Sequence, residues 1–312
     1  MQTSMFGDIP LPDGESAIDA CIGYLTSLRE EGFKRVWLLS RPYDPDVLTV
    51  LAAALREVET IEVATGVQPI QNQHPMLMAQ RALTLNLIAG GRFTLGIGVT
   101  HALASEGMWG IPWDKPVRRM REYLDGLLPL LAGEGVDASG DTVTTRGFVR
   151  VPGATPPAVY IAAMGPHMLR LTGRRTSGTV TWMTGPKTLA EHIVPTLRDA
   201  AEEAGRSATE VRVVAGFPVC VTDDPATARR VAAEQFAIYG TLPAYRAMLD
   251  REGYSGPEDA AIIGDETVVT QRLDELRAAG VDEFIGQVFD VSDEGRARTR
   301  ALMRQCDREA LV

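Results

Sequence analysis

Short apolar runs alternate with longer amphipathic stretches along most of the chain. Continuous apolar runs are typical of buried parallel strands, and apolar residues at three- and four-residue spacing are typical of helices. Strands are therefore expected at residues 5–9, 35–40, 61–67, 93–99, 158–162, 178–183, 211–221 and 284–289. Helices are expected at residues 16–31, 46–59, 75–89, 102–110, 117–131, 167–174, 186–203, 226–239, 242–252, 266–279 and 296–309, with a loop at 253–264.

Eight strands alternating with helices predict an α/β fold, a (β/α)8 TIM barrel. The length of 312 residues fits such a barrel, which takes about 250 residues before insertions. No linker rich in serine, glycine or charge divides the chain, so residues 1–312 are expected to form one domain. Loose alternation over residues 142–151 predicts a small hairpin, inserted at about 138–157 on the C-terminal face of the barrel. An open doubly wound sheet is the alternative, and it explains the tail less well.

Charge and composition narrow the range of partners. The net charge is −10 and basic clusters are absent, which argues against a nucleic-acid partner. No apolar run approaches 18 residues and residues 1–12 lack a signal-peptide pattern, so we expect no membrane span and a cytoplasmic location. The cysteines, Cys21, Cys220 and Cys306, are widely separated, and the histidines lack metal-binding spacing, so neither a disulfide framework nor a metal site is expected.

The stretch from Gly90 to His101 has the most informative pattern. It reads Gly-Gly-Arg-Phe-Thr-Leu-Gly-Ile-Gly-Val-Thr-His, a strand with Gly96 and Gly98 on one face. Two missing side chains leave room for a flat group close to the backbone. Thr100 and His101 follow at the carboxyl end of the strand, where parallel α/β proteins bind ligands. His101 is either a proton donor to a substrate or a structural histidine, and the sequence leaves both open.

Two further strand ends carry candidate site residues. Gly165, Pro166 and His167 lie between a strand and a helix, where free N–H groups hold an anion or simply form an ordinary turn. Trp182 ends a strand and is a candidate for the pocket wall, whereas Trp37 lies in mid-strand and is expected in the core.

The remaining histidines favour structural roles. His74 precedes Pro75 and is expected to cap the helix that begins there, and His192 lies within a helix.

The pattern Gly-Arg-Phe-x-Leu-Gly-Ile-Gly-x-x-His resembles the fourth barrel strand of the bacterial luciferase-like superfamily. It is most similar to the actinobacterial branch that uses the deazaflavin coenzyme F420. The resemblance runs over roughly residues 18–289. It is carried by His74-Pro75, Met120-Arg121-Glu122-Tyr123-Leu124, Ile161-Ala162-Ala163-Met164-Gly165-Pro166, Thr181-Trp182-Met183-Thr184-Gly185-Pro186 and Pro218-Val219-Cys220-Val221-Thr222-Asp223-Asp224-Pro225.

This resemblance implies an oxidoreductase that moves a hydride between F420 and a small organic substrate, either an activated double bond or an alcohol. It implies His101 as the catalytic residue. It implies cofactor contacts at Ser40, Arg41, Gly66, Val67, Gly98, Val99, Thr100, Ala163, Met164, Gly165, Pro166, His167 and Trp182.

Specific roles follow from the resemblance for three of these places. Gly66–Val67 matches a bulge that relatives press against the ring, sometimes through a cis peptide, and Gly165–His167 matches the turn beside the phosphate-bearing side chain. Many relatives carry Asp-His where this chain has Ser40-Arg41, so the ring contact, and with it the catalytic acid, must differ.

Two alternatives remain open. One is a monooxygenase that uses reduced FMN, and the other is a barrel that binds flavin without turnover. Similar proteins are commonly homo-oligomers, so a homodimer is expected.

Overall fold

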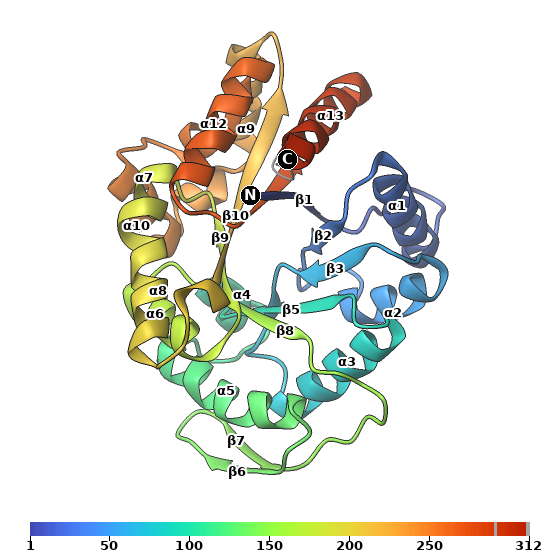
Figure 1. Ribbon diagram of the computed structural model, residues 1–312, viewed down its shortest axis with the longest axis vertical. Coiled ribbons are helices and arrows are strands. Elements are labelled where there is room, and N and C mark those ends of the chain that lie inside the picture. The colour runs from blue at the N-terminus through green and yellow to red at the C-terminus, as the bar shows by residue number, and fades with distance from the viewer. Residues whose placement is uncertain (290–291, 310–312) are drawn as a thin grey trace. The chain divides into compact units, whose positions relative to one another are not determined.

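The computed structural model describes residues 1–289 and 292–309 (Figure 1). These residues fall into two compact units. The N-terminal unit comprises Asp8–Glu30 and Lys34–Ala162. The C-terminal unit comprises Met1–Gly7, Glu31–Phe33 and the described residues from Ala163 onwards.

The N-terminal unit is built on four parallel strands. In order of hydrogen-bonded neighbours they are β2 (Arg35–Leu38), β3 (Glu62–Thr65), β5 (Phe93–Gly98) and β8 (Ala158–Ala162) (Figure 1). The short strand β4 (Gln68–Pro69) pairs with the end of β5. All six residues of β5 are buried. Burial on both faces explains why these strands are continuous apolar runs in the sequence.

The helices of the N-terminal unit are α1 (Ala17–Glu31), α2 (Val47–Glu57), α3 (Pro75–Ile88), α4 (Ala102–Gly107) and α5 (Pro116–Leu131). Of these helices, α2 and α3 begin at a capping side chain, Asp46 and His74 respectively. His74 caps α3: its Nδ1 accepts from the Met76 N–H at 3.2 Å, so Nε2 carries the proton and donates to the Thr144 carbonyl at 2.9 Å. The predicted capping role of His74 is confirmed.

A hairpin of β6 (Val136–Ser139) and β7 (Thr144–Gly147) packs against α5 and lies outside it in Figure 1. The insertion was predicted, but its strands begin earlier than residue 142. Gly147 has φ +125°, which ends β7, so residues 148–151 leave the hairpin. Gly126 allows the close approach, because a Cβ there would lie 2.4 Å from the Thr145 hydroxyl.

The C-terminal unit also contains four parallel strands. In order of pairing they are β1 (Gln2–Gly7), β12 (Glu283–Val288), β10 (Arg212–Val221) and β9 (Gly178–Trp182), and β11 (Ile262–Gly264) pairs with the end of β10.

Two expectations about this unit were wrong. The segment expected as a loop contains β11, and β1 begins three residues before the predicted start at residue 5. Polar residues fill the start of β1, where Ser4 donates to the Glu283 carboxylate at 2.7 Å and the Thr3 N–H donates to Asp307 at 2.9 Å. Because both partners lie far along the chain, an apolar pattern could not reveal them.

Most helices of the C-terminal unit have a proline in their first turn, a position at which the missing N–H costs nothing. These helices are α6 (Pro166–Arg175), α7 (Pro186–Thr188), a π-turn (Leu189–Ile193), α8 (Val194–Glu203), α9 (Pro225–Gln235), α10 (Pro243–Glu252), α11 (Pro257–Ala260), α12 (Glu266–Ala278) and α13 (Asp293–Glu309), with 3-10 turns at Ala208–Glu210 and Ala237–Gly240. The helix expected at 186–203 therefore contains a π-turn.

Other structural features bear on the predicted function classes. Within residues 1–289 and 292–309, no helix is long and apolar enough to cross a bilayer, and no three metal-ligating side chains cluster. Cys21, Cys220 and Cys306 are buried, and none of them forms a disulfide.

Candidate functional site

The paired glycines of β5 make room for a bulge of the chain itself. A Cβ on Gly96 would lie 1.9 Å from the Thr65 carbonyl oxygen, and one on Gly98 would lie 2.7 Å from the Val67 side chain. Gly66 and Val67 are joined by a cis peptide bond. The sequence pattern predicts that this space receives a flat ligand group. Instead, the two glycines admit the Gly66–Val67 bulge, and the outer surface of the bulge is what a ligand could meet.

Strand register shows which side of the sheet this bulge faces. Gly96 lies opposite Tyr160, whose ring meets the Trp37 ring edge-on at 5.6 Å between centroids. Trp37 and Tyr160 lie on β2 and β8, which are not neighbouring strands, so both rings, and Gly96 with them, face the concave side of the sheet. Val67 approaches the glycines from that side. Trp37 is fully buried, as its predicted core position requires.

The backbone after β5 is fixed at both polar atoms of Thr100. Its N–H donates to Gln71 Oε1 at 3.1 Å, and its carbonyl accepts from Trp113 Nε1 at 2.5 Å. The next residue, His101, is the N-cap residue of α4, but its side chain makes no capping hydrogen bond. Burial lowers the pKa of His101, so the neutral imidazole is favoured at neutral pH. This form suits a proton acceptor.

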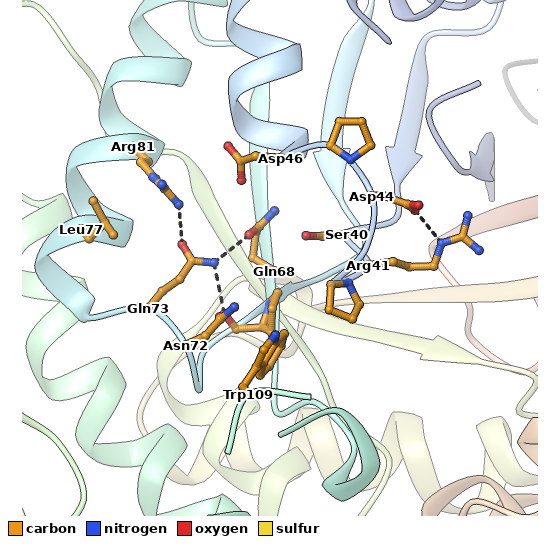
Figure 2. Close-up of a pocket in the computed structure, with 13 residues that line it drawn as sticks. Ser40, Arg41, Asp44, Asp46, Gln68, Asn72, Gln73, Leu77, Arg81 and Trp109 are labelled. Carbon is orange, nitrogen blue, oxygen red and sulfur yellow. Dashed lines mark hydrogen bonds and ion pairs between the residues drawn. The ribbon is translucent and has the colours of Figure 1, made fainter. Parts of the chain in front are cut away.

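Ser40 and Arg41, after β2, line a cavity of about 340 Å³ (Figure 2). Arg41 is held by two carboxylates, Asp8 and Asp44, each 2.7 Å away, and lies over the Tyr43 ring. The structure thus places Ser40 and Arg41 on this cavity, together with Gln68 from β4.

In the C-terminal unit, α6 begins at an open N-terminus. Gly165 is its N-cap and supplies no side chain, Pro166 has no N–H, and all three of Gly165, Pro166 and His167 are exposed. Among the described residues, no side chain caps the first free N–H groups, those of His167 and Met168. A helix start of this kind attracts an anion through its free N–H groups and its dipole.

The residues before α6 are fixed by neighbouring polar side chains. The Ala163 carbonyl accepts from the Thr179 hydroxyl at 2.9 Å, and the Met164 carbonyl accepts from His192 Nε2 at 2.9 Å. His192 is placed by the π-turn, an irregularity often found near functional sites.

The surroundings of His192 are electropositive. Burial lowers the pKa of His192, and the guanidinium groups of Arg251 and Arg170 lower it further. The imidazole is therefore favoured in its neutral form, with Nε2–H as the donor to Met164, and the local field favours an anion.

Trp182, at the end of β9, stands in an aromatic cluster. Its ring lies 5.1 Å from Phe6, 6.2 Å from Phe236 and 6.0 Å from Tyr239, centroid to centroid. The indole is buried, yet within the part of the chain that the structure describes Nε1–H has no hydrogen-bond acceptor. A buried donor without a partner costs about 1–3 kcal/mol, which marks this position as a candidate ligand contact.

Two positioning residues were not identified from the sequence. Nothing in the local sequence pattern distinguishes Gln71, although its side chain is buried and hydrogen-bonded to Thr100. His192 was assigned a structural role within a helix, and its link to the start of α6 depends on a π-turn that leaves no clear sequence signal.

Comparison with known proteins identifies the family. The model of the luciferase-like monooxygenase family matches residues 5–283. A 5,10-methylenetetrahydromethanopterin reductase of Methanolobus tindarius is 30% identical over 209 residues, which are 67% of this chain and 64% of the reductase. The matched part of the chain thus spans less than two thirds of that relative.

Two solved structures share the fold. The F420-dependent tetrahydromethanopterin reductase of Methanopyrus kandleri has a TM-score of 0.80 at 22% identity, with 100% of both chains covered. An F420-dependent secondary alcohol dehydrogenase, solved with an F420–acetone adduct, has a TM-score of 0.81 at 18% identity, with 98% of both chains covered. At these identities the likeness concerns the fold, which is the predicted (β/α)8 barrel. The family match makes this an oxidoreductase of the luciferase-like type. The chain belongs to the luciferase-like monooxygenase family.

Proposed function

We propose that the protein is an F420-dependent oxidoreductase that transfers a hydride between the deazaflavin and a small alcohol or activated double bond. The proposal is supported by the 30% identical reductase and by the similarity in fold to F420-dependent enzymes. When bound, the deazaflavin supplies two-electron hydride chemistry. The protein supplies binding, orientation and a proton acceptor.

The observation that carries the proposal is the open N-terminus of α6. A phosphate diester on the cofactor side chain is an anion with oxygen acceptors, and the His167 and Met168 N–H groups are uncapped donors. Gly165 leaves the approach clear, since a Cβ there would meet nothing within 4 Å. Arg170 and Arg251 add positive charge nearby. These residues would hold the phosphate.

Other residues have complementary roles. The outer face of Val67 would support the ring, with Val99 and the fixed backbone of Thr100 shaping the same strand end. The Trp182 indole N–H would donate to a polar atom of the ligand. The neutral His101 imidazole would accept the proton of an alcohol hydroxyl as the carbon gives up its hydride.

An FMN-dependent monooxygenase is the second candidate, and the family match favours it because that family is named for monooxygenases. FMN also carries a phosphate, so the α6 terminus alone does not select between the two cofactors. A barrel that binds flavin without turnover is the third candidate. The homodimer remains a prediction that light scattering tests.

The test is a titration of the purified protein with oxidised F420 and, separately, with FMN, following cofactor fluorescence. We expect F420 to bind at least tenfold more tightly, and we expect bound F420 to be reduced by an alcohol in a panel of secondary alcohols. His101→Ala should lower the reduction rate and leave F420 affinity within about twofold. Tighter FMN binding would contradict the F420 assignment. Unchanged rates in His101→Ala would contradict the role of His101.

A further inference from the structure

The cavity lined by Ser40 and Arg41 contains a buried hydrogen-bond donor without a partner. Gln68 is 1% exposed and lies in the cavity wall, and among residues 1–289 and 292–309 its Nε2 has no acceptor (Figure 2). We call this space the Gln68 cavity. A buried amide N–H pair without a partner is costly unless a ligand supplies the acceptor.

A hydrogen-bond relay fixes which atom of Gln68 faces the cavity. Arg81 can only donate, and its Nη1 donates to Gln73 Oε1 at 3.1 Å. Gln73 must therefore present its Nε2, which donates to Gln68 Oε1 at 3.0 Å. This chain leaves the Gln68 amino group as the free end. In Figure 2 it is turned away from Gln73 towards Asp46 and Ser40.

The Gln68 cavity lies on the other side of the sheet from the Gly66–Val67 bulge. Gln68 pairs with Ile97, whereas the concave side is lined by Gly96 and Gly98, so Gln68 faces the helices. The N-terminal ends of α2 and α3 supply Asp46 and Leu77 to the wall. The Gln68 side chain itself therefore points away from the concave face.

The charges around the Gln68 cavity balance. Its charged side chains are Arg41, Arg81, Asp44 and Asp46, two of each sign. Asp46 caps α2 through Oδ2 alone, which accepts from the Thr49 N–H at 3.0 Å and the Thr49 hydroxyl at 2.5 Å. Its Oδ1 therefore remains available to accept a hydrogen bond from a ligand.

A donor and an acceptor that are both available in the wall of one cavity match a hydroxyl group, which accepts and donates at once. Arg81 adds further donors, since no carboxylate pairs with it in the described part of the chain. The indole of Trp109 and the rings of Pro42 and Pro69 offer apolar surface to the C–H groups of a ring or chain.

From this geometry we infer that the Gln68 cavity binds a small neutral polyhydroxylated molecule, a sugar or polyol. A volume of about 340 Å³ accommodates one such unit. The inference does not depend on the redox activity.

The test uses isothermal titration of the full-length protein with D-glucose and with xylitol. Gln68→Glu keeps the acceptor for Gln73 and replaces the free donor with an acceptor, so we expect affinity to fall by about tenfold or more. Gln271→Glu makes the same chemical change on the exposed face of α12 and should leave affinity unchanged. F420 affinity should stay the same in both variants, which also shows that they fold.

A second variant, Trp109→Ala, removes the half-exposed indole without burying charge, and we expect a loss of about fivefold or more. Absence of saturable binding of either probe to the wild type would overturn the inference. So would equal binding by Gln68→Glu, a parallel loss of F420 affinity, or Gln68-dependent binding of acetate or phosphate in place of the sugars.

Discussion

Two helices of the C-terminal unit begin with the same dipeptide, yet only one of the two has an N-terminus without a capping side chain among the described residues. Gly165-Pro166 starts α6 and Gly185-Pro186 starts α7. At α7 the Glu252 carboxylate accepts from the Lys187 N–H at 3.0 Å, the Thr188 N–H at 2.8 Å and the Thr188 hydroxyl at 2.6 Å. At α6 no side chain among the described residues takes this place.

The space around Gly165 and Gly185 shows the same difference between the two helix starts. A Cβ on Gly185 would lie 2.3 Å from the Glu252 carboxylate carbon, whereas a Cβ on Gly165 would meet nothing within 4 Å. One glycine makes room for the protein's own anion, and the other leaves room for an anion from outside. The chain therefore satisfies the α7 terminus itself, and we propose that the α6 terminus receives a ligand.

The largest expected effect comes from capping the free N–H groups at the start of α6 with a side chain of the protein. Gly165→Asp places a carboxylate at the N-cap, where the extended backbone (φ −77°, ψ 149°) suits a capping side chain. It should weaken F420 binding by about 2–3 kcal/mol, roughly 30- to 150-fold, while stabilising the helix by a few tenths of a kcal/mol. Fluorescence titration and chemical denaturation measure the two effects.

Gly165→Asn distinguishes the effect of the negative charge of the aspartate from the effect of its size. It caps the same N–H groups without a negative charge, so its loss of F420 affinity should be smaller than that of Gly165→Asp. Equal F420 affinity in the wild type and both variants would show that α6 does not hold the phosphate.

Removing the carboxylate that caps α7 should lower the stability of the fold and leave the affinity for F420 unchanged. Glu252→Ala removes an acceptor of three hydrogen bonds, so we expect the free energy of unfolding to fall by about 2 kcal/mol. Glu252→Gln retains one oxygen and should lose less. Urea denaturation checks this, and a variant as stable as the wild type would break the comparison.

A third carboxylate, Glu122, closes a backbone site in the hairpin turn. It accepts from the Thr142 N–H at 2.7 Å, the Thr142 hydroxyl at 2.6 Å and the Val143 N–H at 3.1 Å. Burial opposes the charge, but these hydrogen bonds outweigh it and lower the pKa of Glu122 to about 2.

The sign of the pH effect follows from this pKa. The native value lies below that of the unfolded chain, so the stabilisation is complete above pH 4.5 and is lost as the pH falls towards 2. Glu122→Gln should be less stable than the wild type by about 1–2 kcal/mol at pH 7, and the gap should narrow in acid. Denaturation at pH 7, 4 and 3 measures the gap, and parallel stability curves would refute this account of Glu122.

The smallest effect concerns His192. Its native pKa is lowered by burial and by the two arginines, so the unfolded chain takes up the proton first and stability falls as the pH drops below about 6.5. We expect a loss of about 1 kcal/mol or less, absent in His192→Gln. Denaturation at pH 5.5 and 7.5 measures it.

Phosphate binding at α6 should reverse part of this shift. A nearby anion favours the imidazolium, so the NMR titration of His192 should move to higher pH when F420 binds. A pKa that stays fixed on saturation with F420 would place the anion elsewhere.

The alternation of strands and helices could be predicted because it follows from the local spacing of apolar residues and from residues that mark helix ends, such as Pro75 and Gly91. The start of β1 could not, since its polar residues Thr3 and Ser4 are stabilised by Asp307 and Glu283. β11 could not either, because three residues give too short a pattern and its pairing with β10 supplies the stability.

The candidate site shows the same limit. Gly96 and Gly98 stand out in the sequence, but the sequence alone could not show that the neighbouring bulge fills their space. Likewise, Gly165-Pro166 and Gly185-Pro186 are locally equivalent, and only a glutamate at position 252 separates them. Local sequence therefore finds helix termini, while distant side chains decide which terminus remains available.

The most direct test of the phosphate assignment compares F420 with its deazaflavin chromophore lacking the phosphate-bearing side chain, on the wild type and on Gly165→Asp. If the α6 terminus holds the phosphate, the wild type binds F420 much more tightly than the truncated chromophore, and Gly165→Asp loses that preference while binding the truncated form as the wild type does. If Gly165→Asp weakens both ligands equally, or neither, the α6 terminus is not the phosphate site.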